Sequence, residues 1–118
     1  MTSEEKIAAV HRYLQAFAEQ DIEIIKDLYA EDAVIDDPVG VDRYEGIDAI
    51  LGFYEPSLQS GARLELTGAP RCTGNAVAFP FRAVIGELQI EIIDVFEFNE
   101  AGKVVSMKAY WGPENTLA

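Results

Sequence analysis

The chain has 118 residues, a formal net charge of −12, an apolar fraction of 49% and a charged fraction of 25%. This length and composition predict a single folded domain spanning residues 1–118, large enough for one core and too small for two. The acidic charge argues against nucleic acids and anionic membrane surfaces as partners, because both are bound through cationic patches.

The rare residue types exclude further classes of protein. Cys72 is the only cysteine and His11 the only histidine, which excludes an intramolecular disulfide and a metal cluster built from His and Cys. No apolar run approaches the ~20 residues of a membrane span, and the polar start MTSEEK does not resemble a signal peptide. We therefore expect a soluble cytoplasmic protein with no metal, no membrane contact and no nucleic-acid partner.

The N-terminal residues predict two helices. Thr2 and Glu5 form a capping box for an amphipathic helix over about residues 4–19. Tyr13 lies on the apolar face of this helix, where it is either a core tyrosine tied to a neighbour or a phenol that faces a cavity. Asp21 is the expected cap of a second helix, whose inward residues are Ile22, Ile25, Leu28 and Tyr29.

A short strand is expected at residues 33–37 and ends before Pro38. Asp37 is in phase with apolar neighbours at the end of this strand, where a loop can open onto a pocket. The uninformative alternative is an aspartate that starts a turn before a proline. Asp36 has the opposite phase, so we expect it to be solvated.

A third helix is expected to start near Ile47, to bury a stripe that includes Tyr54, and to end at Pro56 and Gly61. The remaining chain predicts strands separated by Gly- and Asn-containing turns, at residues 63–67, 71–73, 76–85, 88–98 and 104–111. Pro80 lies inside the third of these strands, which indicates an edge position or a bulge.

Helices followed by strands are typical of an α+β domain. A long, strongly bent antiparallel sheet around three helices would enclose a conical pocket. Such a sheet would also leave one broad face uncovered, which indicates a dimer.

The expected strand 88–98, LQIEIIDVFEF, contains an aspartate on its apolar side. Asp94 is in phase with Ile92 and Phe96, which face inward if the strand is half-buried. An ionised carboxylate in apolar surroundings is costly, and burial raises its pKa, so the group tends to keep its proton. Two other interpretations stay open: an aspartate at the wet end of a strand, or one paired with a buried arginine.

Asp37 and Asp94 therefore have different predicted environments in one pocket, the first at a loop and partly wet, the second desolvated. An ionised carboxylate, a neutral carboxylic acid and the phenol of Tyr13 form a set suited to proton abstraction next to a carbonyl. The base takes the proton while the two donors hold the oxygen as it becomes an enolate. This chemistry needs no metal, cofactor or nucleophile.

These residues lie in segments that resemble the Δ5-3-ketosteroid isomerases of the nuclear-transport-factor-2-like (NTF2-like, SnoaL-like) superfamily, over nearly the whole chain. The matching segments are HRYLQAF, LYAEDAVIDDPVG, GFYEPS, FPFR, IIDVFEF and GKVVSMKAYWGPEN. The resemblance implies an α+β, cone-shaped NTF2-like fold, in which three N-terminal helices pack in a strongly curved mixed or antiparallel sheet, and a homodimer. Ketosteroid isomerases are a known case of a carboxylic acid kept neutral at pH 7, so that role comes from the resemblance, whereas the inward phase of Asp94 comes from the residues.

The resemblance also implies roles for individual residues. It makes Asp37 the general base that moves a proton from C4 to C6 of the steroid, and Tyr13 and protonated Asp94 the oxyanion hole for the 3-oxygen of the dienolate. Tyr29 and Tyr54 match tyrosines that hydrogen-bond behind the oxyanion-hole tyrosine. Six residues fall at or beside positions that line the steroid cavity: Val39, Phe53, Phe79, Phe81, Met107 and Trp111.

One segment departs from the family pattern, and three other functions stay open. The Ile85-Gly86-Glu87 connection looks shorter than the hairpin of some relatives, which bears on substrate range rather than on chemistry. The alternatives are a non-catalytic steroid- or lipid-binding dimer, another cone-fold enzyme of the epoxide hydrolase or polyketide cyclase type, and a protein-interaction module. The epoxide-hydrolase type is identified by an Asp-Arg-Asp arrangement that activates water. Here no arginine shares the phase of Asp94, and Arg82 has the phase opposite to Phe81, which argues against this alternative. Three polar groups in one apolar pocket argue against the interaction module.

Overall fold

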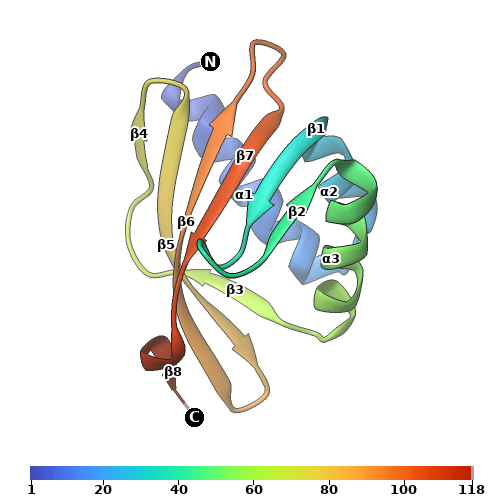
Figure 1. The fold of residues 1–118 in the computed structure, drawn as a ribbon. Helices are drawn as coiled ribbons and strands as arrows, with labels where there is room; N and C mark the ends of the chain where they lie inside the picture. The colour runs from blue at the N-terminus through green and yellow to red at the C-terminus, as the bar shows by residue number, and fades with distance from the viewer. Residues whose placement is uncertain (118) are drawn as a thin grey trace.

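The computed structural model describes residues 1–117 as three α-helices packed on one strongly curved sheet (Figure 1). The helices and the short 3-10 turn are α1 (Ser3–Glu19), α2 (Ile22–Leu28), α3 (Ile47–Gln59) and η1 (Pro113–Asn115). The strands are β1 (Tyr29–Asp36), β2 (Arg43–Glu45), β3 (Arg63–Leu66), β4 (Arg71–Thr73), β5 (Ala76–Ile85), β6 (Leu88–Phe98), β7 (Val104–Tyr110) and β8 (Thr116–Leu117). No helix within residues 1–117 is both long and apolar enough to cross a membrane.

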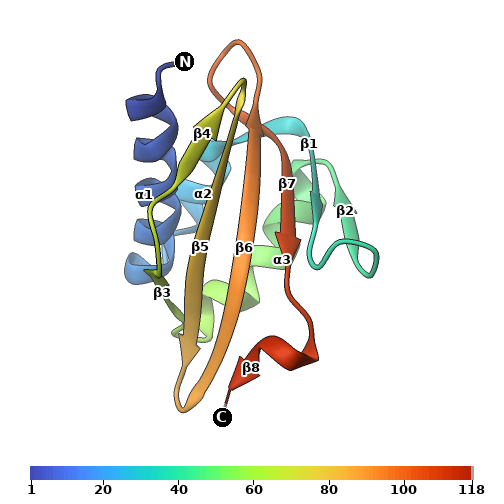
Figure 2. The ribbon, with the colours of Figure 1, turned by 90° about the vertical axis from the view of Figure 1, so that its left-hand side faces the viewer.

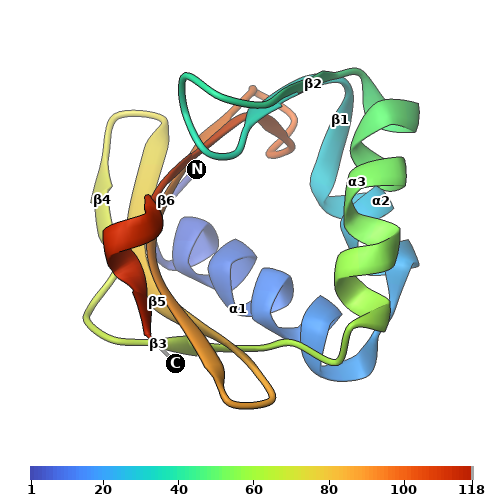
Figure 3. The ribbon, with the colours of Figure 1, turned by 60° about the horizontal axis from the view of Figure 1, so that its bottom comes forward.

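The sheet is mixed and has the order β2-β1-β7-β6-β5-β3, with β4 paired to β5 and β8 paired to β6. The β1–β7 pair is parallel and the other pairs are antiparallel. Figure 2 shows β5 and β6 as the two long strands of the sheet. Figure 3 shows the sheet curling around α1, with α3 on the open side. The structure thus confirms the α+β class and the curved mixed sheet predicted from the sequence.

The core lies between the helices and the inner face of the sheet, and local sequence explains how its elements form. In α1 the predicted capping box is present: Thr2 N donates to Glu5 Oε1 (2.8 Å) and Glu5 N donates to Thr2 Oγ1 (3.1 Å). Along β5 and β6 the residues alternate between the core and the outer face, as the two-residue period requires. One polar group in this core is Asp94, only 1% exposed.

Two predicted boundaries differ from the structure. β1 begins at Tyr29 rather than at residue 33, because two exposed acidic residues, Glu31 and Asp32, interrupt its alternation without ending it. α3 ends at Gln59, before Gly61 as expected, but it continues through Pro56, which was also expected to terminate it. Proline removes one helical hydrogen bond, but here the affected carbonyl belongs to the exposed Gly52, where water can reach it.

Three further expectations differ from the structure. The strand β2 has only three residues and no predicted counterpart. Asp36 is not simply solvated: its side chain is 15% exposed and lies 3.6 Å from Arg43. Pro80 is neither on an edge strand nor at a bulge, because β5 pairs with β6 without interruption. It is tolerated because it falls in the gap between β3 and β4, and its carbonyl accepts a bond from Thr67 N (3.0 Å).

Candidate active site

A cavity of about 490 Å³ lies between the inner face of the sheet and helices α1 and α3. Its wall is mostly apolar, and its polar lining residues come from both helices, the β1–β2 loop and β6: Tyr13, Asp37, Asp42, Tyr54, Ser57, Ser60 and Asp94. Within the described part of the chain, no group of three or more His, Cys, Asp or Glu side chains could hold a metal ion. The polar groups that the side chains bring to the cavity are mainly carboxyl groups, phenols and hydroxyls.

Asp94 occupies the buried end of this cavity. Its Oδ1 is buried and has no hydrogen-bond partner among residues 1–117, and none of the ion pairs there includes Asp94. Burial, and secondarily the negative charge of Asp37, raise the pKa of Asp94 well above its ordinary value. A carboxyl group in this position favours the protonated form and can donate a hydrogen bond. The geometry matches neither a wet strand end nor an arginine pair.

Asp37 follows β1 and lines the same cavity, at a less buried position than Asp94. The loop that carries it is tied down twice, by Asp37 N to Asp42 O (3.0 Å) and by Val39 N to Ala109 O of β7 (3.0 Å). Trp111 Nε1 donates to Asp37 Oδ1 at 2.8 Å. Burial raises the pKa of Asp37, the Trp111 bond lowers it, and the charge of Asp42 raises it. This carboxylate is held in place and partly stabilised in its ionised form.

Three buried tyrosines form a hydrogen-bonded chain behind the cavity. Tyr54 Oη lies 3.0 Å from Tyr13 Oη and 2.7 Å from Tyr29 Oη. Burial raises the pKa of all three phenols well above the ordinary value, so they stay protonated. When Tyr29 donates to Tyr54 and Tyr54 donates to Tyr13, the proton of Tyr13 is free to point into the cavity. Tyr29 itself lies outside the cavity lining.

Of the six residues expected at the steroid cavity, three line it and three do not. Phe53, Phe81 and Trp111 share the wall with Asp37 and Asp94. The residues outside the lining are Val39, Phe79 and Met107.

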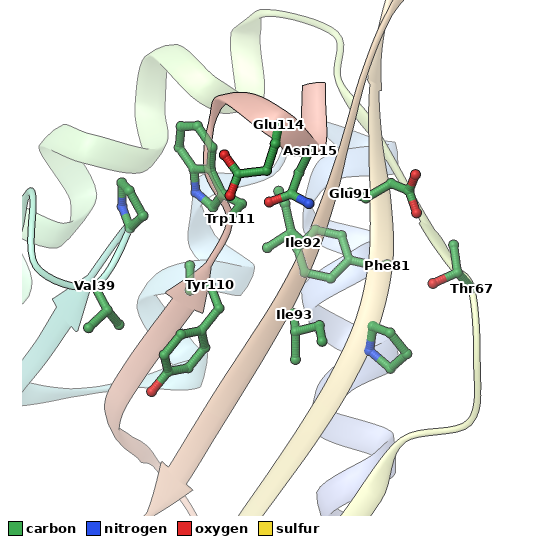
Figure 4. A pocket seen from close by; sticks show the side chains of 13 residues that line it. Val39, Thr67, Phe81, Glu91, Ile92, Ile93, Tyr110, Trp111, Glu114 and Asn115 are labelled. Atoms are coloured by element: carbon green, nitrogen blue, oxygen red, sulfur yellow. The ribbon is translucent and has the colours of Figure 1, made fainter. Parts of the chain in front are cut away.

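The packing explains where those three side chains lie. Phe79 and Met107 are fully buried, and the Phe79 ring packs on Tyr13 and Phe96, where it supports the phenol from behind. Val39 is 41% exposed and lines a separate hollow that extends over the outer face of the sheet (Figure 4).

Sequence reasoning missed Asp42, Ser57 and Ser60, which also line the cavity. Asp42 lies in an irregular loop, where no periodicity points to a face. Ser57 and Ser60 follow Tyr54 by three and six residues, so helical spacing would have placed Ser57 on the same face. That signal was lost because Pro56 was expected, together with Gly61, to terminate the helix, so no residue after Tyr54 was assigned to its inward face.

Residues 10–107 match the family model of the SnoaL-like domain. The chain belongs to the SnoaL-like family. Its similarity to a curated "Steroid Delta-isomerase" from Nocardioides simplex is 41% identity over 117 residues, covering 96% of this chain and 94% of that protein. The chain is thus a relative of the steroid Δ-isomerases, as its motifs indicated. This similarity over nearly the whole chain identifies it as an enzyme.

A solved structure has the same fold. It is that of SalBIII, described as an epoxide hydrolase/cyclase-like enzyme with a role in pyran ring formation in the polyether salinomycin. The TM-score is 0.87 at 27% identity, over 96% of this chain and 95% of that one. The SnoaL-like cone fold is therefore confirmed, and it hosts more than one chemistry.

Proposed function

We propose that this protein isomerises Δ5-3-ketosteroids to Δ4-3-ketosteroids by moving one proton from C4 to C6 through a dienolate. The observation that carries the proposal is a buried carboxyl group without a partner, Asp94, in the same apolar cavity as the tethered carboxylate of Asp37. Two carboxyl groups whose environments separate their pKa values can act as acid and base at one pH. The similarity to a steroid Δ-isomerase supports the substrate class.

In the proposed first step, the carboxylate of Asp37 removes a proton from C4. The electrons of the broken C4–H bond form a C3–C4 double bond, and the carbonyl electron pair moves onto the 3-oxygen, which becomes negative. In the second step, the Asp37 carboxylic acid returns the same proton to C6, and the dienolate becomes the conjugated enone. The base is regenerated and no other reactant is consumed. A positioned general base of this kind typically contributes ~10²–10⁴-fold in rate.

Tyr13 and protonated Asp94 would donate hydrogen bonds to the 3-oxygen as its charge develops. Donors fixed before the reaction stabilise this charge without reorganising, and loss of one typically costs ~10²–10³-fold in rate. Tyr54, with Tyr29 behind it, would hold the Tyr13 hydroxyl and leave its proton for the substrate.

A second candidate is an enzyme of the epoxide hydrolase or cyclase type, which the likeness to SalBIII favours. An Asp-Arg-Asp mechanism needs an arginine between the carboxylates. Arg82 does not line the cavity, and its Nη1 lies 3.8 Å from Glu65 of the neighbouring strand. This arrangement supports isomerisation over epoxide hydrolysis. A third candidate, a non-catalytic steroid-binding protein, would leave a substrate unchanged.

The decisive experiment is to add 5-androstene-3,17-dione and follow the ultraviolet absorbance of the conjugated enone. The wild type should produce it, and Asp37→Asn should lose nearly all activity, by ~10²–10⁴-fold. Tyr13→Phe and Asp94→Ala should each impair turnover less, by ~10²–10³-fold. Asp36→Asn is a matched control, because it removes the adjacent carboxylate, which does not line the cavity. Full turnover by Asp37→Asn would disprove the base assignment, and an inactive wild type would disprove the function.

We further propose that the protein is a homodimer that pairs through the outer face of the sheet. Ile93 of β6 and Tyr110 of β7 lie directly opposite each other on this face and are 49% and 48% exposed. Figure 4 shows both side chains beside the outer hollow that Val39 lines. No helix of residues 1–117 covers these two side chains. We therefore propose that a second copy of the chain packs on them. The cytoplasmic location expected from the sequence stays a prediction.

A further inference from the structure

The proposed catalytic residues lie at one end of the cavity, and the register of the strands shows where its other end lies. From Asp94 the lining continues along β6 to Ile92 and Ile90, a distance of about 13 Å at the rise of a strand. Ile90 pairs with Ala83 of β5, and Ala83 pairs with Leu64 of β3. All of these residues line the cavity. The cavity is therefore elongated, and its far end lies where β3, β5 and β6 meet the C-terminal end of α3.

The far end of the cavity reaches solvent. Asp94 is 1% exposed and Ile90 is half-buried, whereas Ser60 at the end of α3 is exposed. Ser57, one turn earlier in α3, is half-buried and also lines the cavity. Ser57 and Ser60 thus bring hydroxyl groups to the otherwise apolar wall of this end.

The hydrogen bonds of the two serines leave acceptor sites. Ser57 Oγ donates to Phe53 O (3.3 Å), and Ser60 Oγ donates to Ser57 O (2.6 Å). Each hydroxyl has one proton and two acceptor lone pairs. Ser60 Oγ already accepts from Ala62 N (3.3 Å), whereas Ser57 Oγ accepts no bond from residues 1–117. Because both serine hydroxyls donate their protons to carbonyl groups of α3, each can only accept a further hydrogen bond. A ligand group that donates a hydrogen bond would therefore pair with them.

The far end of the cavity contains no charge that could balance an ionised ligand group. Asp37 and Asp42 lie at the catalytic end, where Asp94 is protonated. Among the described lining residues there is no lysine or arginine to balance a carboxylate or phosphate on the ligand. A neutral hydroxyl group therefore suits the far end better than an anionic group, whose burial without a partner is costly.

We propose that Ser57 and Ser60 are specificity residues that accept a hydrogen bond from a neutral hydroxyl group at the end of the steroid remote from its 3-ketone. The proposal rests on the proposed function and narrows its substrate class to Δ5-3-ketosteroids with a hydroxyl on the D ring. A steroid with a long alkyl side chain would cover the Ser57 hydroxyl without using its free acceptor site, so it would lose a hydrogen bond that water makes in the empty cavity.

The test compares three Δ5-3-ketosteroids that differ only at C17: 17β-hydroxy, 17-keto and unsubstituted. The wild type should have a kcat/KM for the 17β-hydroxy steroid that is roughly 3- to 10-fold above that for the unsubstituted one, as expected for one neutral hydrogen bond. The double variant Ser57→Ala/Ser60→Ala should remove this preference through KM, so that the kcat/KM values of the 17β-hydroxy and unsubstituted steroids become equal. Ser57→Thr keeps the hydroxyl and should retain the preference.

Ser106→Ala is the matched control, because Ser106 is a half-buried serine of β7 that does not line the cavity. Equal losses on all three substrates would show a structural role of the serines and overturn the proposal, as would no loss on any. If the wild type isomerises none of them, the proposed function fails, and the serines are tested by binding instead. Fluorescence of the single tryptophan, Trp111, then compares 17β-hydroxy and unsubstituted Δ4-3-ketosteroids, and equal affinities overturn the proposal.

Discussion

At the residue scale, Asp94 combines its proposed role as a hydrogen-bond donor with a cost to folding. Folding moves its carboxyl group from water into an apolar wall and supplies no partner for Oδ1 within residues 1–117. The protonated form avoids most of the cost of a buried charge. The same lack of a protein partner leaves the group available to a substrate oxygen.

This cost predicts a pH dependence of stability. The folded-state pKa of Asp94 is raised above its unfolded value of about 3.9. Between these two values the unfolded chain has released the proton and the folded chain has kept it, so stability falls as pH rises through this window. Asp94→Asn has no such titration. Its free energy of unfolding relative to wild type should therefore increase from pH 4 to pH 7, by up to about 1.4 kcal/mol per pH unit.

Urea denaturation of both proteins at several pH values measures this difference. Asp48→Asn is the control, because Asp48 is an exposed carboxylate of α3. A constant difference between Asp94→Asn and wild type across the pH range would contradict the prediction.

At the element scale, the site depends on where β1 and β7 end. The two strands run parallel, with Ile35 opposite Met107 and Asp36 opposite Lys108. Beyond this register, Asp37 leaves β1 and Trp111 leaves β7, and their side chains meet in a hydrogen bond. The base is thus held by a contact between two strand ends that are 74 residues apart in sequence.

Trp111→Phe tests this contact. It keeps an aromatic wall but removes the N–H that lowers the pKa of Asp37, so this pKa should rise further above its ordinary value. The acidic limb of kcat/KM should therefore move to higher pH, and activity at pH 5 should fall more than activity at pH 8. Phe53→Leu alters the lining without changing a side-chain hydrogen bond and should shift KM only. An unmoved acidic limb in Trp111→Phe would show that the indole does not tune the base.

The sequence predicted those elements whose signal is local. The expected strands 76–85 and 88–98 coincide with β5 and β6, because their alternation is uninterrupted. Inward phase within β6 was enough to predict a buried Asp94. The lengths of β1 and α3 depend on tertiary packing around exposed acids and around Pro56. The local pattern indicated a later start for β1 and did not show that α3 continues through Pro56.

Contacts between distant segments had no local signal. The Trp111–Asp37 bond and the position of Asp42 depend on the β1–β7 register and on an irregular loop, which no periodicity describes. Val39 and Phe79 were expected at the cavity only from the family resemblance. The loop that carries Val39 is tied to Ala109, and the Val39 side chain lines the outer hollow. Phe79 is fully buried and packs against the ring of Tyr13.

At the scale of the whole molecule, the outer face of the sheet is connected to the site. Pro38 and Val39 line the outer hollow, and they directly follow Asp37 in the chain. A second copy packed on this face would therefore also brace the loop that carries the base. The net charge of −12 on each chain opposes this contact, because two acidic copies repel each other.

Ile93→Glu tests the proposed dimer. It adds a carboxylate next to Tyr110 at the centre of the exposed pair, where the two copies would have to bury it. Sedimentation should show a wild-type dimer that tightens with added salt, because salt screens the repulsion between two acidic chains. The variant should sediment as a 13.0 kDa chain, and it should isomerise more slowly because the loop after Asp37 has lost its support. Ala18→Glu adds the same charge on the exposed side of α1 and should remain dimeric. A monomeric wild type, or a dimer unaffected by Ile93→Glu, would exclude this face as the interface.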